Sequence, residues 1–272
     1  MIEFSHLDIV QEEKVLIAYL NRPQKANALN RKLWFEIEKL ANWVDENPDV
    51  RVLILAGHGT HFTSGIDFSL IQEMSSYFQK KPQGIRQEWL YREIRKLQNA
   101  FSALENCSKP VLAAVHGSCI GGGVDLISAC DMRYATEDSR FCIKEIDLAI
   151  VADIGTIQRL PTIIGEGMAR ELTMTARPFS GQEAKEIKLV NRTYPSKEAM
   201  MHGVKEIAQC IAKKSPLSMR NTKRTFVYGR DHSVQEGLEQ VARLNAGILF
   251  SSDSTEAMTS MMQKKKPSFS DS

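Results

Sequence analysis

The chain has 272 residues, enough for one large domain or one domain with a helical appendage, and a core of that size needs no disulfide or metal to fold. Its formal net charge of +2 argues against a nucleic-acid partner held by a basic surface, and no apolar run reaches the roughly 18 residues of a membrane span. The five cysteines are odd in number and lack CxxC spacing, which indicates reduced thiols rather than a disulfide framework or a zinc site.

Neither end of the sequence shows a recognisable targeting signal. The stretch MIEFSHLDIVQEEKV lacks the charged, apolar and small-residue regions of a signal peptide and is too acidic for an organelle transit sequence. The final residues PSFSDS are not a peroxisomal SKL signal. We therefore expect a cytoplasmic protein.

The first two thirds of the chain alternate buried strands with helices. Asn30 is the predicted N-cap of a helix that runs to Val44, and a second helix is predicted over 124–130. A loop-and-helix segment spans 67–106, and its middle, FQKKPQG, is expected to be mobile or inserted. This repetition of strand, loop and helix predicts an α/β architecture with parallel strands. The predicted strands are 14–20, 50–56, 110–115, 133–135 and 140–143.

From about Gly165 onward the pattern is almost wholly helical. Ser180 and Ser233 each stand three residues before a Glu, as in a capping box, and Ser215 precedes a Pro that suits the first helical position. The apolar stripe of the last third needs a surface to cover it, and both the body of the domain and a partner subunit remain open as that surface. The stripe comprises Val241, Leu244 and Ile248.

Two glycine-containing loops each follow a buried strand and precede a helix. They are Thr63–Asp67 (TSGID) and Ile120–Asp125 (IGGGVD). Glycines at a helix start leave backbone N–H groups unshielded, and the first N–H groups of a helix have no partner inside it. Either loop alone could equally serve tight strand–helix packing. Neither fits GxxxxGK[ST] or GxGxxG, so a nucleotide cofactor is disfavoured.

Three acidic residues follow the second loop. Asp125 falls in the first turn of the predicted helix, and Glu145 lies twenty residues further on, beside Asp147, which is expected to face solvent or cap a turn. Asp153 follows the apolar run Leu148–Ala152, where an unpaired charge is costly. An N-cap for the next helix is the rival explanation of Asp153.

Histidines and serines near these loops do not form a recognised catalytic or metal-binding pattern. His58, His61 and His116 lack the helical HExxH spacing and an acidic ligand pattern, so loop or packing roles are expected and no metal is predicted. Ser64 and Ser118 lack a GxSxG elbow.

The run KPVLAAVHGSCIGGGVDLISACDMRYATEDSRF, continuing into KEIDLAIVADIGTIQRLPTIIG, strongly resembles the crotonase (enoyl-CoA hydratase/isomerase) superfamily, and within it the delta-3,5-delta-2,4-dienoyl-CoA isomerases. The resemblance extends over nearly the whole chain. It implies an α/β spiral of repeated ββα units over 1–200 that contains the active site, and a C-terminal helical, oligomerising region over 201–263. The tail, 264–272, is predicted to be disordered. Trimers, commonly paired as hexamers, are implied, and so is the absence of a cofactor, because coenzyme A arrives as part of the substrate.

The resemblance also implies roles for individual residues. The backbone N–H groups of Ile66 and Gly122 would hold the thioester oxygen. Hydratases carry glutamates at the positions of Asp125 and Glu145 and a glycine at Asp153, whereas acids at all three positions are typical of the dienoyl isomerases. The implied reaction is isomerisation of 3,5-dienoyl-CoA to 2,4-dienoyl-CoA in fatty-acid β-oxidation, with Glu145 serving C2 and Asp153 serving C6, or the reverse. A 2-enoyl-CoA hydratase and a catalytically inactive acyl-CoA-binding protein are the alternatives.

The expected contacts to substrate include the loop that wraps the adenine end of coenzyme A, although Lys25 in that loop could equally be a solvated charge. Asp67 is also expected to cap the helix that follows it. One departure from the isomerases is LAIVAD before Asp153, where Ala149, Ile150 and Val151 replace a Gly and smaller residues and would narrow or shift the acyl pocket. The expected contact residues are Lys25, Ala26, Ser64, Gly65, Asp67, Phe68 and Gly121.

Overall fold

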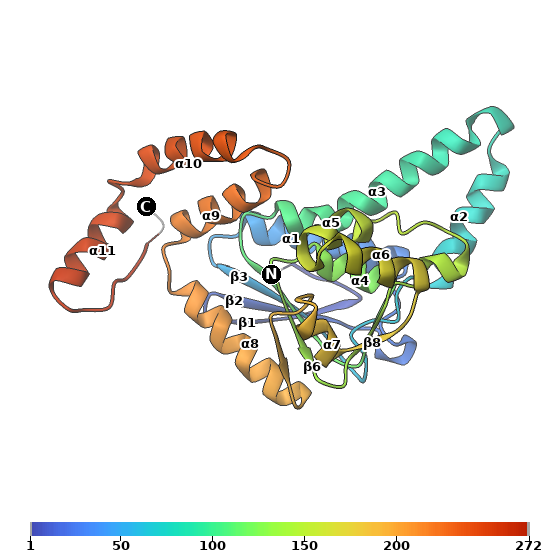
Figure 1. The fold of residues 1–272 in the computed structure, drawn as a ribbon, viewed down its shortest axis with the longest axis horizontal. Coiled ribbons are helices and arrows are strands. Elements are labelled where there is room, and N and C mark those ends of the chain that lie inside the picture. The colour runs from blue at the N-terminus through green and yellow to red at the C-terminus, as the bar shows by residue number, and fades with distance from the viewer. Residues whose placement is uncertain (1, 271–272) are drawn as a thin grey trace.

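A twisted, mainly parallel sheet forms the centre of the computed structural model, which describes residues 2–270 (Figure 1). Its strand order is β1-β2-β3-β4-β6-β9, and every neighbouring pair is parallel except β1 with β2. A second, three-stranded sheet has the order β5-β7-β8. The predicted α/β architecture with parallel strands is confirmed. The strands are β1 Leu7–Glu12, β2 Val15–Leu20, β3 Val52–Gly57, β4 Val111–Val115, β5 Ser118–Ile120, β6 Met132–Thr136, β7 Arg140–Cys142, β8 Phe179–Ser180 and β9 Arg192–Tyr194.

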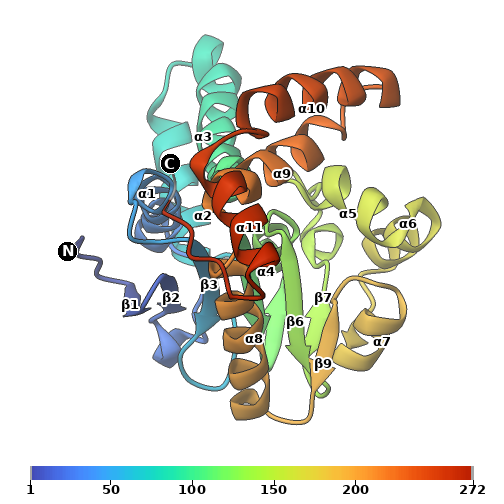
Figure 2. The ribbon, with the colours of Figure 1, turned by 90° about the vertical axis from the view of Figure 1, so that its left-hand side faces the viewer.

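Helices cover both faces of the large sheet, which is why its central strands are apolar at consecutive positions. In β3, Leu53 and Leu55 belong to the cluster that includes residues of α1 and α3, whereas Val52 and Ile54 pack with residues of α8 on the opposite face. Figure 2 shows α8 lying along this second face. The α-helices are α1 Arg31–Glu46, α2 Phe68–Lys80, α3 Arg86–Asn106, α4 Gly122–Ser128, α5 Thr156–Ile164, α6 Glu166–Thr175, α7 Gly181–Glu186, α8 Lys197–Ala212, α9 Pro216–Tyr228, α10 Val234–Ile248 and α11 Ser252–Met262.

Side-chain caps begin the helices where the sequence predicts them. Asn30 accepts a hydrogen bond from the Leu33 N–H, and Ser233 forms a complete capping box with Glu236. Ser215 caps α9. Ser180 also caps its helix, but it does so without the reciprocal bond, because the carboxylate that could return to it pairs with Arg177.

Two parts extend from the body of the molecule (Figure 1). One is the arm made by α2 and α3, with the short 3₁₀ turn Gln83–Ile85 near its tip, where the sequence predicts a mobile or inserted stretch. The other is the set of α9, α10 and α11. None of its apolar stripe residues is fully buried; Val241, Leu244 and Ile248 line a cavity of about 250 Å³ together with residues of α9 such as Phe226. No helix within residues 2–270 combines the length and apolarity required to cross a membrane.

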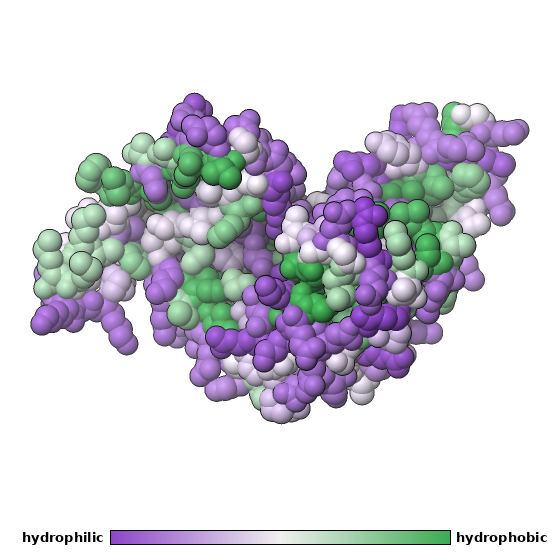
Figure 3. Space-filling model, in the orientation of Figure 1, coloured by the Kyte–Doolittle hydropathy of each residue, from purple (hydrophilic) through white to green (hydrophobic). Residues whose placement is uncertain are grey.

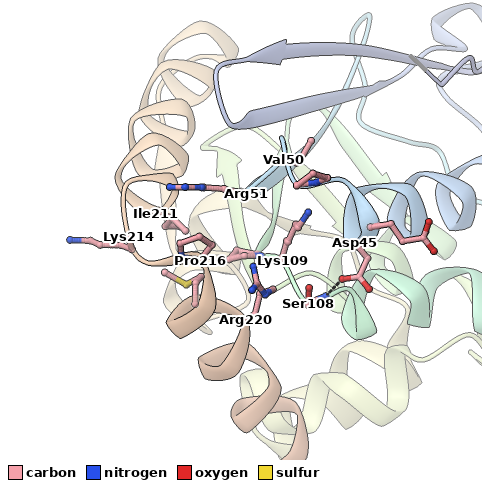
Figure 4. A pocket seen from close by; sticks show the side chains of 13 residues that line it. Asp45, Val50, Arg51, Ser108, Lys109, Ile211, Lys214, Pro216 and Arg220 are labelled. Atoms are coloured by element: carbon pink, nitrogen blue, oxygen red, sulfur yellow. Dashed lines mark hydrogen bonds between the residues drawn. The ribbon is translucent and has the colours of Figure 1, made fainter. Parts of the chain in front are cut away.

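The C-terminal helices meet the body at a junction drawn in Figure 4, a cavity of about 260 Å³ between the end of α1, the starts of β3 and β4, and the α8–α9 turn. Arg51 joins several parts of the chain there, because its guanidinium donates to the carbonyls of Ala212 (3.0 Å) and Phe269 (2.6 Å). The Ser270 N–H also donates to Asp253 of α11. Disorder of 264–272 stays a prediction; Phe269 bonds to Arg51 of the body, Ser268 and Ser270 bond to α11, and 271–272 lie outside the described residues.

A buried ion pair fixes α9 to the core. Lys223 is 6% exposed, and its ammonium lies 2.7 Å from Oδ2 of Asp131 while donating to the carbonyls of Leu104 and Lys109. Asp131 also accepts a hydrogen bond from the Val111 N–H at the start of β4. Because all donors of the ammonium meet acceptors from the core, the pair ties the C-terminal helices to the edge from which β4 starts.

Replacing Lys223 by Met should therefore lower the free energy of unfolding by about 3–5 kcal/mol, because the carboxylate of Asp131 stays buried without its counter-charge. Urea denaturation at pH 7 measures this loss. Arg224→Met is the matched control, since Arg224 is the exposed neighbour on the same helix and should change the value by about 0.5 kcal/mol at most. Equal losses in the two variants would contradict the anchoring role.

Candidate active site

The two glycine-containing loops lie side by side because isolated parallel bridges join them to their neighbours. Thr63 bridges to Cys119 of β5, with the Thr63 N–H donating to Ser118 O (2.9 Å) and the Ile120 N–H donating to Thr63 O (3.2 Å). On its other side the first loop bridges to Leu29, whose N–H donates to Gly65 O (2.8 Å). The first loop is thus held between the segment before α1 and the second loop.

Two backbone amides at these loops have no partner among the described residues, one because of a bridge and one because it begins a helix. The Leu29 bridge uses the Gly65 carbonyl and the Asp67 N–H, so the Ile66 N–H points away from that bridge. Gly122 is the first residue of α4, where an N–H has no acceptor inside its own helix. Within the described chain neither amide donates a hydrogen bond. Both are therefore available to an oxygen atom of a ligand.

Close approach of the loops depends on glycine at two positions. A methyl group at Gly65 (φ +90°) would lie 2.6 Å from Ile120 O and 3.7 Å from the Gly122 nitrogen. A methyl group at Gly121 (φ +50°) would lie 3.0 Å from Oε1 of Glu145. The first glycine brings the two loops together, and the second brings the backbone of the second loop against one of the three acids.

Asp125 is buried (1% exposed) in α4, behind the second loop. Its Oδ1 accepts hydrogen bonds from both the N–H (2.7 Å) and the hydroxyl (2.6 Å) of Thr156, the first residue of α5. Burial raises the pKa of Asp125 and the nearby charge of Glu145 adds to the effect, so the pKa reaches about 7 although the hydrogen bonds from Thr156 oppose the shift. This carboxyl thus titrates near neutral pH.

Glu145 and Asp153 complete one electrostatic cluster with Asp125. Burial raises the pKa of Glu145, and the charge of Asp153 raises it further. Burial also raises the pKa of Asp153, and both residues add to the raised pKa of Asp125. Oε2 of Glu145 is buried and has no hydrogen-bond partner among the described residues. Three carboxyls that repel one another cannot all be ionised at low cost, so unlike protonation states are favoured near neutral pH.

Two hollows adjoin this cluster. Glu145 lines a mainly apolar cavity of about 410 Å³ with residues of α5 and α6, and Ile150 and Val151 line the same cavity. These two side chains are 45% and 66% exposed, although both were expected to narrow or shift an acyl pocket. Asp153 lines a more polar hollow of about 490 Å³ beside α3, and its carbonyl accepts a hydrogen bond from Gln98 (2.5 Å).

Asp153 is not the N-cap of α5. That helix begins at Thr156, and Gly155 in the N-cap position offers no side chain. The hydrogen bonds of Thr156 to Asp125 cap the helix instead, from a different element of the fold. Asp147 is exposed, as its sequence position predicts, and it pairs with Lys144.

The remaining predicted contact residues surround the first loop. Lys25 and Ser64 are exposed, and the Ser64 N–H donates to the Ala26 carbonyl (2.9 Å), which ties the expected coenzyme A loop to the loop of Ile66. Asp67 caps α2 through Ser69 and pairs with Arg22 (2.9 Å). Burial acts to raise the pKa of Asp67, but the hydrogen bonds from Ser69 and Arg22 outweigh it and lower the pKa. Phe68, the first residue of α2, is 66% exposed and free to meet a ligand.

The three histidines have local partners. His58 pairs with Asp8 (2.8 Å) and stacks on Tyr19, His61 accepts from the Ser118 N–H, and His116 contacts Gly59 O (3.0 Å). Within residues 2–270 no group of three or more His, Cys, Asp or Glu side chains is arranged to hold a metal ion.

Thr156 is the residue of this site that the sequence analysis misses. Its two hydrogen bonds join α4 to α5, and the side chain is fully buried. The only local signal is a Thr that follows Gly155 at a helix start, which by itself is typical of ordinary capping.

Comparison with known proteins agrees with this geometry. The family model for enoyl-CoA hydratase/isomerase matches residues 11–272. The chain belongs to the enoyl-CoA hydratase/isomerase family. It is 46% identical to the peroxisomal delta(3,5)-delta(2,4)-dienoyl-CoA isomerase of Arabidopsis thaliana over 99% of this chain and 98% of that protein. It is 42% identical to the human mitochondrial enzyme of the same name, over 95% of this chain and 80% of that protein.

The fold is also that of solved members of the enoyl-CoA hydratase/isomerase family. An enoyl-CoA hydratase from Bacillus anthracis superposes with a TM-score of 0.89 at 29% identity, covering 98% of this chain and 100% of that one. The predicted crotonase-like α/β fold and the resemblance to dienoyl-CoA isomerases are both confirmed. Members of this family are enzymes.

The expectation of a cytoplasmic protein is wrong. It rested on the lack of a recognisable targeting signal at either end. The similar dienoyl-CoA isomerases of Arabidopsis thaliana and human are named as peroxisomal and mitochondrial proteins. Targeting signals are read by receptors, so charge and hydropathy patterns at a terminus are weak evidence against them.

The pKa of Asp125 predicts an inverse relation between stability and pH. The folded-state pKa of about 7 exceeds the usual value near 4, so between these pH values the carboxyl of Asp125 is more protonated in the folded state than in the unfolded state. The free energy of unfolding therefore falls as pH rises from about 4 to about 7. Asp125→Asn keeps an oxygen acceptor for Thr156 and removes the buried charge. At pH 8 the free energy of unfolding of this variant should exceed that of the parent by about 2–4 kcal/mol, so the variant should unfold at a higher temperature. The difference between the two proteins should be smaller at pH 5.

Thermal unfolding at both pH values measures the effect. Asp147→Asn serves as control, because Asp147 is exposed and its replacement should shift neither value appreciably. A pH-independent difference for Asp125→Asn would show that the carboxyl is already ionised at low pH.

Proposed function

We propose that this protein isomerises 3,5-dienoyl-CoA to 2,4-dienoyl-CoA in fatty-acid β-oxidation. The observation that carries the proposal is the cluster of one buried and two partly buried carboxyls, all with raised pKa values, beside two backbone amides without partners among the described residues. The similarity to dienoyl-CoA isomerases at 42–46% identity supports it.

The amides of Ile66 and Gly122 supply the electrostatic part of the reaction. A proton at C2 of a thioester becomes acidic only when the developing negative charge on the thioester oxygen is stabilised, and preorganised N–H donors do this with no reorganisation. Loss of one such donor typically costs ~10²–10³ in rate. Because both amides come from loops fixed by parallel bridges, they would hold the oxygen in one position throughout the reaction.

The carboxyls supply the proton transfers. Removal of a proton from C2 by Glu145 gives a conjugated enolate that extends to C6. Delivery of a proton to C6 by Asp153 then leaves double bonds at C2 and C4 and restores the thioester carbonyl. Oε2 of Glu145 suits the accepting role, since no donor among the described residues competes for its lone pairs. No bond to solvent forms and no electron acceptor is required, so we propose that the enzyme needs no cofactor beyond the coenzyme A of its substrate.

Hydration of a 2-enoyl-CoA is the second candidate, and the arrangement of Asp125 disfavours it. A hydratase uses two acids to hold one water molecule. Here Oδ1 of Asp125 is already occupied by both donors of Thr156, and a third acid stands nearby. The similarity to a hydratase of solved structure is also lower, at 29% identity. A catalytically inactive acyl-CoA-binding protein would have no need for three costly buried acids.

Asp153→Asn separates these activities. It should lower kcat for 3,5-dienoyl-CoA by about 10²–10⁴-fold, because the proton at C6 loses its donor, and should change any hydration of 2-enoyl-CoA little. Absorbance of the conjugated product follows the first reaction. Glu145→Gln should abolish both, and Asp147→Asn should leave both intact. If Asp153→Asn retained full isomerisation, or if the parent consumed only the 2-enoyl thioester, the isomerase proposal would fail.

We also propose that the enzyme is a trimer or a pair of trimers, assembled through the C-terminal helices. Hydrophobic side chains gather over α10 and α11 in Figure 3. Phe250, in the turn between these helices, is 88% exposed and Met261 of α11 is 80% exposed, values that are unfavourable on a surface facing water. A second copy of the chain would cover this face.

Phe250→Glu should shift the assembly toward smaller species, because it places a charge in the apolar contact. Light scattering coupled to gel filtration measures the mass. Val10→Glu is the control, since Val10 is an exposed apolar residue of β1, outside the C-terminal helices. An unchanged mass for Phe250→Glu, or a monomeric parent, would contradict this assembly.

A further inference from the structure

A single residue holds the buried carboxyl of Asp125. Thr156 donates its backbone N–H and its hydroxyl to the same oxygen, Oδ1, at 2.7 and 2.6 Å. The distances are those of strong hydrogen bonds to a charged acceptor. Because α5 has no side-chain cap of its own, the carboxylate of α4 performs that function, and the two helices are joined at this point.

No other donor to this carboxyl exists within the described chain. The charged and titratable groups near Asp125 are Glu145, Asp153, Arg159 and Cys119. Glu145 and Asp153 repel it, and the thiol of Cys119 is fully buried with its pKa raised by desolvation. The guanidinium of Arg159 is committed to Glu105 (2.9 Å) and to the Ile154 carbonyl (3.3 Å). The hydrogen bonds of Thr156 are therefore what favours the ionised form of Asp125, against burial and the charge of Glu145, which raise its pKa.

We propose that Thr156 is a positioning residue of the isomerisation, whose two hydrogen bonds favour the anionic form of Asp125, so that its charge opposes ionisation of the two proton-transferring acids. This inference rests on the proposed function. Thr156 acts through Asp125, and it needs no contact with substrate. A negative charge beside Glu145 and Asp153 disfavours a second and third negative charge, which supplies one acid and one base at the same pH.

The proposal predicts what happens when the Thr156 hydroxyl is removed. Thr156→Val keeps the backbone donor and the branched shape but loses the 2.6 Å hydrogen bond. Asp125 then binds its proton more tightly, and its titration midpoint moves upward by about one pH unit, the amount that one hydrogen bond to a charged group supplies. Over the neutral range its charge is lost, so Glu145 and Asp153 release their protons at lower pH. The basic limb of the kcat/KM profile moves to lower pH accordingly.

Two measurements test this on the full-length protein. The first is the pH profile of kcat/KM on 3,5-dienoyl-CoA. The second is a carbon-13 NMR titration of the Asp125 carboxyl, with the resonance assigned by its loss in Asp125→Asn, and it needs no turnover. Thr156→Ser keeps the hydroxyl and should behave like the parent in both. Thr162→Val is the matched control, because the Thr162 hydroxyl lies on the exposed side of the same helix and bonds only to Arg159 O.

The expected result is a basic limb displaced by at least about half a pH unit in Thr156→Val and an upward titration of Asp125, with the serine variant and the control unchanged. Coincident profiles and titrations for Thr156→Val and the parent would overturn the inference, and so would equal shifts in Thr156→Ser. Should Thr156→Val fail to fold, Thr156→Ala undergoes the same two measurements. A parent without activity on 3,5-dienoyl-CoA would refute the proposed function, whereas the NMR titration would still decide whether Thr156 holds the charge of Asp125.

Discussion

The site depends on one geometric constraint, the packing of the loop of Ile66 between two other backbone segments. Leu29 pairs with it on one side and Cys119 on the other, and each pairing is parallel, as in the sheet below. A parallel bridge uses the N–H and the C=O of one residue on one strand and those of the flanking residues on the other. At the Leu29 bridge, Gly65 and Asp67 are used and Ile66 is left out. The unpartnered amide is thus a consequence of register.

The same constraint explains why the glycines cannot be exchanged for larger residues. At Gly65 a methyl group would meet the carbonyl of Ile120, and at Gly123 it would meet the methyl of Thr63 at 2.5 Å. A side chain at either position would force the two loops apart, because these contacts are shorter than van der Waals distances. The relative position of the two amides, on which the proposed binding of one thioester oxygen depends, would then change.

Sequence alone predicts the parts of this arrangement that depend on local pattern. The strands 14–20, 50–56 and 110–115 are long, apolar runs, and the structure confirms them as β2, β3 and β4. The edge strand β1 and the short strands β5, β8 and β9 escape prediction, because two to six residues of mixed polarity carry little periodic signal and their partners are remote in sequence. The acids and glycines are visible as residues, but their proximity is a tertiary property. Thr156 is missed for the same reason, since it caps its helix through a carboxylate 31 positions away.

Burying three acids together is unfavourable for folding, and the structure compensates only partly. The Thr156 hydrogen bonds oppose the rise in the pKa of Asp125 without cancelling it, and one oxygen of Glu145 has no hydrogen-bond partner in the part of the chain that the structure describes. If stability alone had shaped this region, a glycine or an amide at one of the three positions would relieve the repulsion. Retention of all three carboxyls in one low-dielectric cluster is therefore best explained by chemistry that needs a base and an acid at the same pH. A reaction that moves a proton from one carbon to another, with no net gain or loss, has this requirement at every turnover.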